Sequence, residues 1–140
     1  MRSVSEDSER LPDLSIVIPV YNEELNLYQL YEQLTAALKS VPESWEVIFV
    51  DDASQDGSFE VLRELHKRDS RVRIIRFRRN YGQTAGLSAG FDYARGQIVI
   101  TLDADLQNDP ADIPMLLEKM HEGDYDIISG WRKDRKDNAL

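Results

Sequence analysis

The chain of 140 residues contains no cysteine, so neither disulfide bonds nor thiolate-bound metal ions can stabilise its fold. It also lacks any run of about 18 apolar residues, the length that a membrane-spanning helix needs. Residues 1–13 are polar and of mixed charge, without the apolar stretch of a signal peptide, so we expect a flexible N-terminal tail. These absences predict one soluble domain over residues 14–140.

Positive charge is also scarce, and the net charge of −9 argues against a nucleic-acid-binding protein, which normally carries a basic face. The distribution is uneven, because eight Lys and Arg but only two acidic residues fall between Arg63 and Arg79. Such a cluster is most often a solvated face. The alternative is a basic rim that faces anionic lipid or phosphate.

Short β-branched apolar runs alternate with segments of helical periodicity along the whole chain. The expected strands are residues 14–20, 45–50, 72–77, 97–102 and 125–129. Asn22 is expected to cap the first helix, with Glu23 and Glu24 in its first turn. This alternation predicts an α/β fold with a mostly parallel sheet and helices on both faces.

Ligands of such sheets bind at the carboxyl ends of the strands. We therefore expect four segments to converge on one crevice, namely residues 19–23, 51–58, 77–82 and 103–109. Asp51 and Asp52 follow the second expected strand, where an acidic residue commonly binds a ribose hydroxyl or a base N–H. The alternative is an Asx turn that caps the helix near Ser58.

The turn after the first expected strand contains no glycine, which excludes the G-x-G-x-x-G and P-loop modes of phosphate binding. Gly82, Gly86 and Gly90 recur at every fourth residue, so they share one helical face and indicate close packing of that helix on the sheet. Bound phosphates would therefore need another source of positive charge.

The segment ITLDADLQNDP, residues 100–110, could supply that positive charge by binding a metal cation. Asp103, Asp105 and Gln107 alternate along the chain and can direct their oxygens at one point. Two carboxylates about 5 Å apart, in an effective dielectric near 20, repel by roughly 3 kcal/mol, and a bound Mg²⁺ or Mn²⁺ would remove this repulsion. The alternative is an acidic surface turn. Asp109 is expected to cap the next helix, with Pro110 at its first position.

Arg132 follows the fifth expected strand, again at the ligand edge of the sheet. Its guanidinium could bind a phosphate with two parallel hydrogen bonds. A solvated arginine in a basic tail fits the spacing equally well. His66 and His121 fall on helices beside charged residues, and we assign them no chemistry.

Five stretches in order resemble the family 2 glycosyltransferases: SIVIPVYNEE, VDDASQDGS, RNYGQTAGLSAGFDYARG, TLDADLQNDP and ISGWR. They resemble most the branch that transfers a sugar from a nucleotide to a polyprenyl phosphate. The resemblance covers residues 14–132. It implies a GT-A fold, of which this chain would be the N-terminal, nucleotide-sugar-binding part, and a transfer that inverts the anomeric configuration.

The resemblance also implies roles for individual residues. Those that would bind the donor substrate are Pro19, Tyr21, Glu23, Asp51, Asp52, Arg79, Asn80 and Gly82. Those that would hold a divalent cation, Mg²⁺ or Mn²⁺, are Asp103, Asp105 and Gln107. The catalytic residues would be Asp103, Asp105 and Arg132. Gln83 departs from the pattern, because many relatives carry lysine there, and a cationic role at this position is therefore in doubt.

The implied partners are a UDP- or GDP-sugar and a polyprenyl phosphate, with the whole enzyme in the cytoplasm or at the cytoplasmic face of the membrane. Relatives continue past the arginine with acceptor-binding helices, so we expect donor binding rather than turnover from this chain alone. One alternative is a non-catalytic sugar-nucleotide-binding module. Another is a phosphotransferase of the haloacid dehalogenase type, which also uses D-x-D and Mg²⁺ but places the motif after its first strand.

Overall fold

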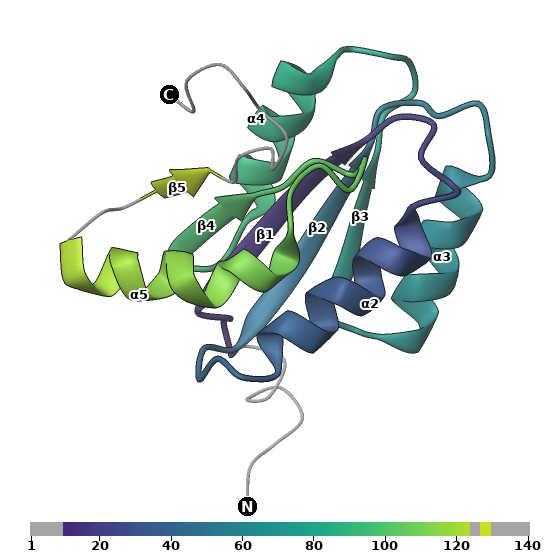
Figure 1. Ribbon diagram of the computed structural model, residues 1–140. Coiled ribbons are helices and arrows are strands. Elements are labelled where there is room, and N and C mark those ends of the chain that lie inside the picture. The colour runs from purple at the N-terminus through teal and green to yellow at the C-terminus, as the bar shows by residue number, and fades with distance from the viewer. Residues whose placement is uncertain (1–9, 124–126, 130–140) are drawn as a thin grey trace, which may run out of the picture.

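All strands of the sheet run parallel, as the sequence predicts (Figure 1). The computed structural model describes residues 10–123 and 127–129. Within them, one five-stranded sheet has the order β3-β2-β1-β4-β5. The strands are β1 (Leu14–Val20), β2 (Trp45–Asp51), β3 (Val72–Arg76), β4 (Ile98–Thr101) and β5 (Ile127–Ser129). The helices are α2 (Leu27–Leu38), α3 (Ser58–Arg68), α4 (Gln83–Tyr93), the 3-10 turn η1 (Pro110–Asp112) and α5 (Ile113–Gly123).

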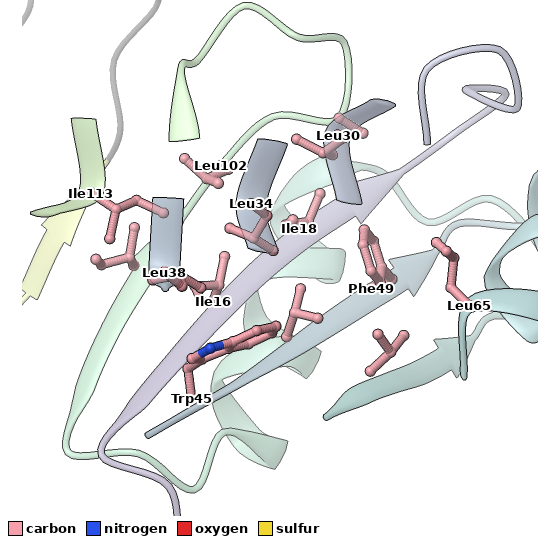
Figure 2. Close-up of a cluster of buried hydrophobic side chains, with 14 of the residues drawn as sticks. Ile16, Ile18, Leu30, Leu34, Leu38, Trp45, Phe49, Leu65, Leu102 and Ile113 are labelled. Atoms are coloured by element: carbon pink, nitrogen blue, oxygen red, sulfur yellow. The ribbon is translucent and has the colours of Figure 1, made fainter. Parts of the chain in front are cut away.

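Helices cover both faces of the sheet: α2, α3 and α5 lie on one face and α4 on the other (Figure 1). Strands β1 and β2 are buried almost throughout, which explains their continuous apolar sequences. On the three-helix face, Ile16 and Ile18 of β1 pack with Leu30 and Leu34 of α2 in the main core (Figure 2). None of the described helices is long and apolar enough to cross a bilayer.

Small residues let α4 lie directly on the sheet. A methyl group at Gly90 would overlap the buried side chain of Val17, and one at Gly86 would lie 3.4 Å from Cβ of Pro19. The predicted close packing is confirmed for these two glycines. Gly82 differs, because it precedes α4 with a φ of 98° and its missing side chain would meet nothing within 4 Å.

The segment after β1 does not begin a helix, so the prediction that Asn22 caps one is wrong. α2 begins at Leu27. Asn22 has a left-handed φ of 54°, and its Oδ1 accepts a hydrogen bond from the backbone N–H of Gln55 at 2.8 Å. The N–H of Glu23 donates to Oγ of Ser58, also at 2.8 Å. The loop after β1 is therefore fastened to the loop after β2, more than 30 residues away in the chain.

A buried carboxylate lies at the amino ends of the strands, opposite the end at which ligands are expected to bind. Glu46 of β2 is 1% exposed and accepts hydrogen bonds from Oγ of Ser15 (2.6 Å), Nη1 of Arg73 (2.9 Å) and the backbone N–H of Arg95 (2.8 Å). Burial raises the pKa of Glu46, but the hydrogen bonds from Ser15, Arg95 and Arg73 outweigh it and hold the pKa below its ordinary value. This carboxylate thus anchors the chain just after α4.

Replacing Gly90 by alanine should destabilise the fold by about 1–3 kcal/mol, because α4 or Val17 must shift to admit the methyl group. Ser88→Ala, on an exposed position of the same helix, is the matched control. Urea denaturation measures both variants. An unchanged free energy of unfolding in Gly90→Ala would contradict the close packing.

The variant Glu46→Gln should be less stable than the parent protein by about 2 kcal/mol at neutral pH, because two arginines lose a buried charged partner. The pKa of Glu46 is lower in the folded protein than in the unfolded chain, so the ionised carboxylate stabilises the fold at any pH above the unfolded pKa. This stabilisation is lost as the pH falls through the folded pKa. The difference between variant and parent should therefore shrink in acid. Denaturation at neutral and acidic pH tests this, with the exposed Glu118→Gln as control.

Candidate active site

The strand order reverses between β1 and β4, because the chain builds outward from β1 to β3 and then returns to the other side of β1. Parallel sheets bind ligands at the carboxyl ends of the strands beside such a switch point. A cleft of about 160 Å³ opens there. Its lining residues are Pro19, Val20, Tyr21, Glu23, Asp52, Gln83, Asp103, Ala104 and Asp105.

The cleft is strongly acidic. Four of its lining residues carry carboxylates, namely Glu23, Asp52, Asp103 and Asp105. Burial raises the pKa of Glu23 above its ordinary value, a hydrogen bond from Asn26 opposes this, and the negative charges of Asp105 and Asp103 raise it further. Four carboxylates that line one small cleft give it a negative potential. The cleft therefore favours a cation.

The loop after β4 directs two aspartates at the cleft. Its backbone is shaped by side chains: Oδ1 of Asn108 accepts from the N–H of Asp103 (2.6 Å), and Oδ1 of Asp105 accepts from the N–H of Gln107 (3.1 Å). Leu106, which lies between Asp105 and Gln107, has a left-handed φ of 65°. This turn ends the extended alternation, so Gln107 does not line the cleft although Asp103 and Asp105 both do.

The donor set fits a hard divalent cation. In the described part of the chain, no three His, Asp or Glu side chains are grouped as a complete metal site. Mg²⁺, however, is usually held by one or two carboxylates together with substrate phosphates. Asp103 and Asp105 supply that number of carboxylates in one cleft.

Asp52 joins three segments of the site. Its two carboxylate oxygens accept hydrogen bonds from the backbone N–H groups of Tyr81 (2.7 Å) and Gly82 (2.9 Å), directly before α4. Its own N–H donates to the carbonyl of Val20 at the end of β1 (2.9 Å). Asp52 is 5% exposed, so these bonds are shielded from water. Asp52 thereby positions the start of α4 beside the cleft.

Asp51 is not among the residues that line the cleft. It is fully buried, and its Oδ1 accepts from the N–H of Ser54 at 3.1 Å. Its Oδ2 is buried and has no hydrogen-bond partner among the described residues. The local Asx turn is made by Asp56, whose Oδ1 accepts from the N–H of Ser58 (2.9 Å).

The predicted single crevice is in fact two adjacent hollows that share Tyr21. The second, which we call the basic pocket, has a volume of about 600 Å³. Its lining residues are Tyr21, Ala53, Ser54, Gln55, Arg76, Phe77, Arg78, Arg79 and Asn80. Arg79 and Asn80 therefore lie in the basic pocket and not in the acidic cleft. Gly82 and Asp51 line neither hollow, and Arg132 lies outside the described residues.

The acidic cleft also contains residues to which the sequence analysis assigned no role. Gln83 begins α4 and lines the cleft, and its Nε2 donates to Oδ1 of Asp103 at 3.4 Å. Ala104 lines it because it lies between the two aspartates. The sequence analysis singled out Gln83 only because many relatives carry lysine at this position. The N-terminal position of Asp109 and Pro110 in η1 is confirmed, since Oδ1 of Asp109 accepts from the N–H of Ala111.

Residues 15–140 match the family described as Glycosyl transferase family 2. The chain belongs to this family. It is 44% identical over 129 residues to the dodecaprenyl-phosphate galacturonate synthase of Rhizobium johnstonii, covering 91% of this chain and 38% of that protein. It is 45% identical over 133 residues to the undecaprenyl-phosphate 4-deoxy-4-formamido-L-arabinose transferase of Edwardsiella ictaluri. This match covers 94% of this chain and 41% of that protein. The chain thus spans about two fifths of these relatives.

Solved structures of two other proteins share the fold. S. aureus TarS in complex with UDP superposes with a TM-score of 0.62 at 21% identity, covering 79% of this chain and 32% of that one. The mannosyltransferase PcManGT of Pyrobaculum calidifontis, in complex with GDP-Man and Mn²⁺, gives 0.56 at 24% identity, covering 69% and 28%. The fold of this family 2 chain is accordingly the GT-A fold, represented by its N-terminal part.

Asp52→Asn should lower the free energy of unfolding by about 1–3 kcal/mol, because an amide keeps one acceptor oxygen and turns an N–H donor toward the other backbone N–H. The exposed Asp92→Asn, on α4 itself, is the control for the loss of charge. Chemical denaturation measures both. Equal stability of Asp52→Asn and the parent protein would contradict the positioning role.

Proposed function

We propose that this chain is the donor-binding part of an inverting glycosyltransferase that moves a sugar from a UDP- or GDP-linked donor to a polyprenyl phosphate, with a divalent cation. The observation that carries the proposal is the acidic cleft at the switch point of a family 2 chain. The names of the two relatives reported above support the acceptor, because both contain a polyprenyl phosphate. Family membership removes the dehalogenase-type alternative.

In this proposal the nucleoside lies against Pro19 and Tyr21, with Glu23 and the Asp51–Asp52 pair beside the base. Arg79, Asn80 and Gly82 contact the donor from the segment before α4. The ring of Tyr21 is 46% exposed and offers a face on which a base can stack. The buried, unpartnered Oδ2 of Asp51 can accept a hydrogen bond once the loop adjusts to a ligand.

Asp103 and Asp105 would hold the cation against the donor diphosphate. Gln107, which does not line the cleft in this structure, would join them only if its loop moved on ligand binding. The cation would supply electrostatic stabilisation of the negative charge on the departing nucleoside diphosphate. Nε2 of Gln83 can donate a hydrogen bond to a diphosphate oxygen, as a lysine would, but it adds no positive charge. Arg132 would bind the phosphates as a further cationic group.

The acceptor makes a strong general base unnecessary. A phosphate monoester is already anionic at neutral pH and can attack the anomeric carbon directly, whereas a sugar hydroxyl must first lose a proton. The acidic residues of the cleft would therefore act on the cation and the donor. The whole enzyme would work at the cytoplasmic face of the membrane, where its lipid acceptor is held.

Calorimetric titration of UDP and GDP, each with Mn²⁺ and with EDTA, tests the donor site. One nucleotide should bind, and only with the cation. Asp105→Asn keeps an oxygen for the N–H of Gln107 but removes the charge, and should weaken binding by more than about tenfold, or 1.4 kcal/mol. Asp92→Asn should bind like the parent protein. Absence of binding by a folded chain would contradict the donor site, and donor binding without transfer by the full-length protein would favour a non-catalytic module.

A further inference from the structure

The first residue of α4 places an uncharged amide in the acidic cleft. Gln83 begins the helix and lines the cleft, and its Nε2 donates a hydrogen bond to Oδ1 of Asp103 at 3.4 Å. Asp103 is one of the two proposed cation ligands and belongs to the loop after β4, 20 residues further along the chain. The side chain of Gln83 therefore lies beside the proposed cation site without being part of the loop that forms it.

Packing fixes the place from which this side chain starts. The two oxygens of Asp52 accept hydrogen bonds from backbone N–H groups just before α4, among them that of Gly82 at 2.9 Å. One turn into the helix, Gly86 lies against the sheet, where an added methyl group would be 3.4 Å from Cβ of Pro19. The side chain of Gln83 takes no part in these contacts. Replacing it should therefore change the charge in the cleft without moving the helix.

The negative charge of the cleft makes the charge of this side chain important. Among the residues that the structure describes, four carboxylates and no lysine or arginine line the cleft. A unit charge placed about 4 Å from another, in an effective dielectric near 20, changes a binding constant by more than about tenfold. The amide of Gln83 brings no such charge, so the carboxylates keep their attraction for a cation. A nucleoside diphosphate, itself an anion, is repelled here unless a cation enters with it.

A charged side chain at the same position would alter this balance. A lysine reaches at least as far as the amide of Gln83, so its ammonium could pair with Asp103 or contact a phosphate directly. The first contact would occupy a cation ligand, and the second would supply the positive charge that a diphosphate needs. A glutamate would act in the opposite sense, because it would add a carboxylate beside Asp103 and Asp105.

We propose that the neutral side chain of Gln83 preserves the affinity of the acidic cleft for a divalent cation and so makes nucleotide binding depend on that cation. The amide leaves both aspartates to the cation and offers the diphosphate a hydrogen-bond donor but no countercharge. Gln83 is thus a specificity-determining residue, which sets how the charge of the donor is balanced. The inference rests on the proposed function, because that function assigns the cation and the nucleotide to this cleft.

Titration of Mn²⁺ into the chain, followed by the paramagnetic resonance signal of the free ion, tests the effect on the cation. Gln83→Lys should bind Mn²⁺ at least about tenfold more weakly than the parent protein, or about 1.4 kcal/mol. Gln83→Glu should bind it about tenfold more tightly. A gain in affinity does not arise from a folding defect, so the two variants together separate the effect of charge from misfolding.

The matched controls place the same charges on Ser88, an exposed residue of the same helix. Ser88 lies five residues after Gln83, about 7.5 Å along the helix axis, and does not line the cleft. Ser88→Lys gives the same net charge as Gln83→Lys, −9 + 1 = −8. It should change the Mn²⁺ affinity by less than about threefold, because water and salt weaken the interaction of exposed charges. Equal effects at the two positions would overturn the inference, which requires a local charge.

Calorimetric titration with UDP and GDP tests the effect on the nucleotide. In EDTA the parent protein should bind neither nucleotide, whereas Gln83→Lys should bind the one that the parent protein binds with Mn²⁺. The ratio of the affinities with Mn²⁺ and with EDTA should be at least about tenfold smaller in Gln83→Lys than in the parent protein. An equal ratio would overturn the inference and leave the donor site intact.

The two titrations also distinguish failure of this inference from failure of the proposed function. If the parent protein binds Mn²⁺ more tightly than Gln83→Lys but neither binds a nucleotide, the donor site fails while the role of Gln83 in cation binding is supported. If the parent protein binds a nucleotide with Mn²⁺ and the Mn²⁺ affinity of Gln83→Lys is unchanged, the donor site holds and the inference is overturned. A folded parent protein that binds no Mn²⁺, with or without nucleotide, would overturn both.

Discussion

Two buried carboxylates, Glu46 in β2 and Asp52 directly after it, hold the two ends of α4, and the geometry of the cleft depends on them. Asp52 binds the backbone before the helix through Tyr81 and Gly82, and Glu46 binds the backbone N–H of Arg95 after it. Burying these charges is costly unless hydrogen bonds satisfy them, and each carboxylate has several. The glycines of α4 then let the helix lie close enough to the sheet for both contacts.

The position of α4 connects this packing to chemistry. Gln83 is the first residue of the helix and reaches Asp103, so a shift of the helix start would move a wall of the cleft. On the other side, the loop after β1 is fastened to the loop after β2, which holds Tyr21 and Glu23 in place. Hydrogen bonds to backbone atoms thus organise the ligand edge.

The charges at this edge are segregated into two neighbouring hollows. Carboxylates gather in the acidic cleft, where a cation and a diphosphate are proposed to meet, and arginines gather across Tyr21 in the basic pocket. Opposite charges so close would neutralise one another if their side chains formed ion pairs. Instead, the carboxylate of Asp52 accepts hydrogen bonds from backbone N–H groups. The guanidinium groups of Arg76 and Arg79 lie over the rings of Phe59 and Tyr81. Each hollow therefore keeps its own potential.

The sequence by itself determined the strands, the helices and the acidic loop after β4, because burial periodicity and the placement of Asp103 and Asp105 are local properties of the chain. It also predicted the close packing of Gly86 and Gly90. Only the tertiary structure decided that Asn22 would not start a helix, that Gln107 does not line the cleft, and that the ligand edge divides in two. These outcomes depend on hydrogen bonds between segments about 30 residues apart and on a left-handed turn, neither of which a local pattern encodes.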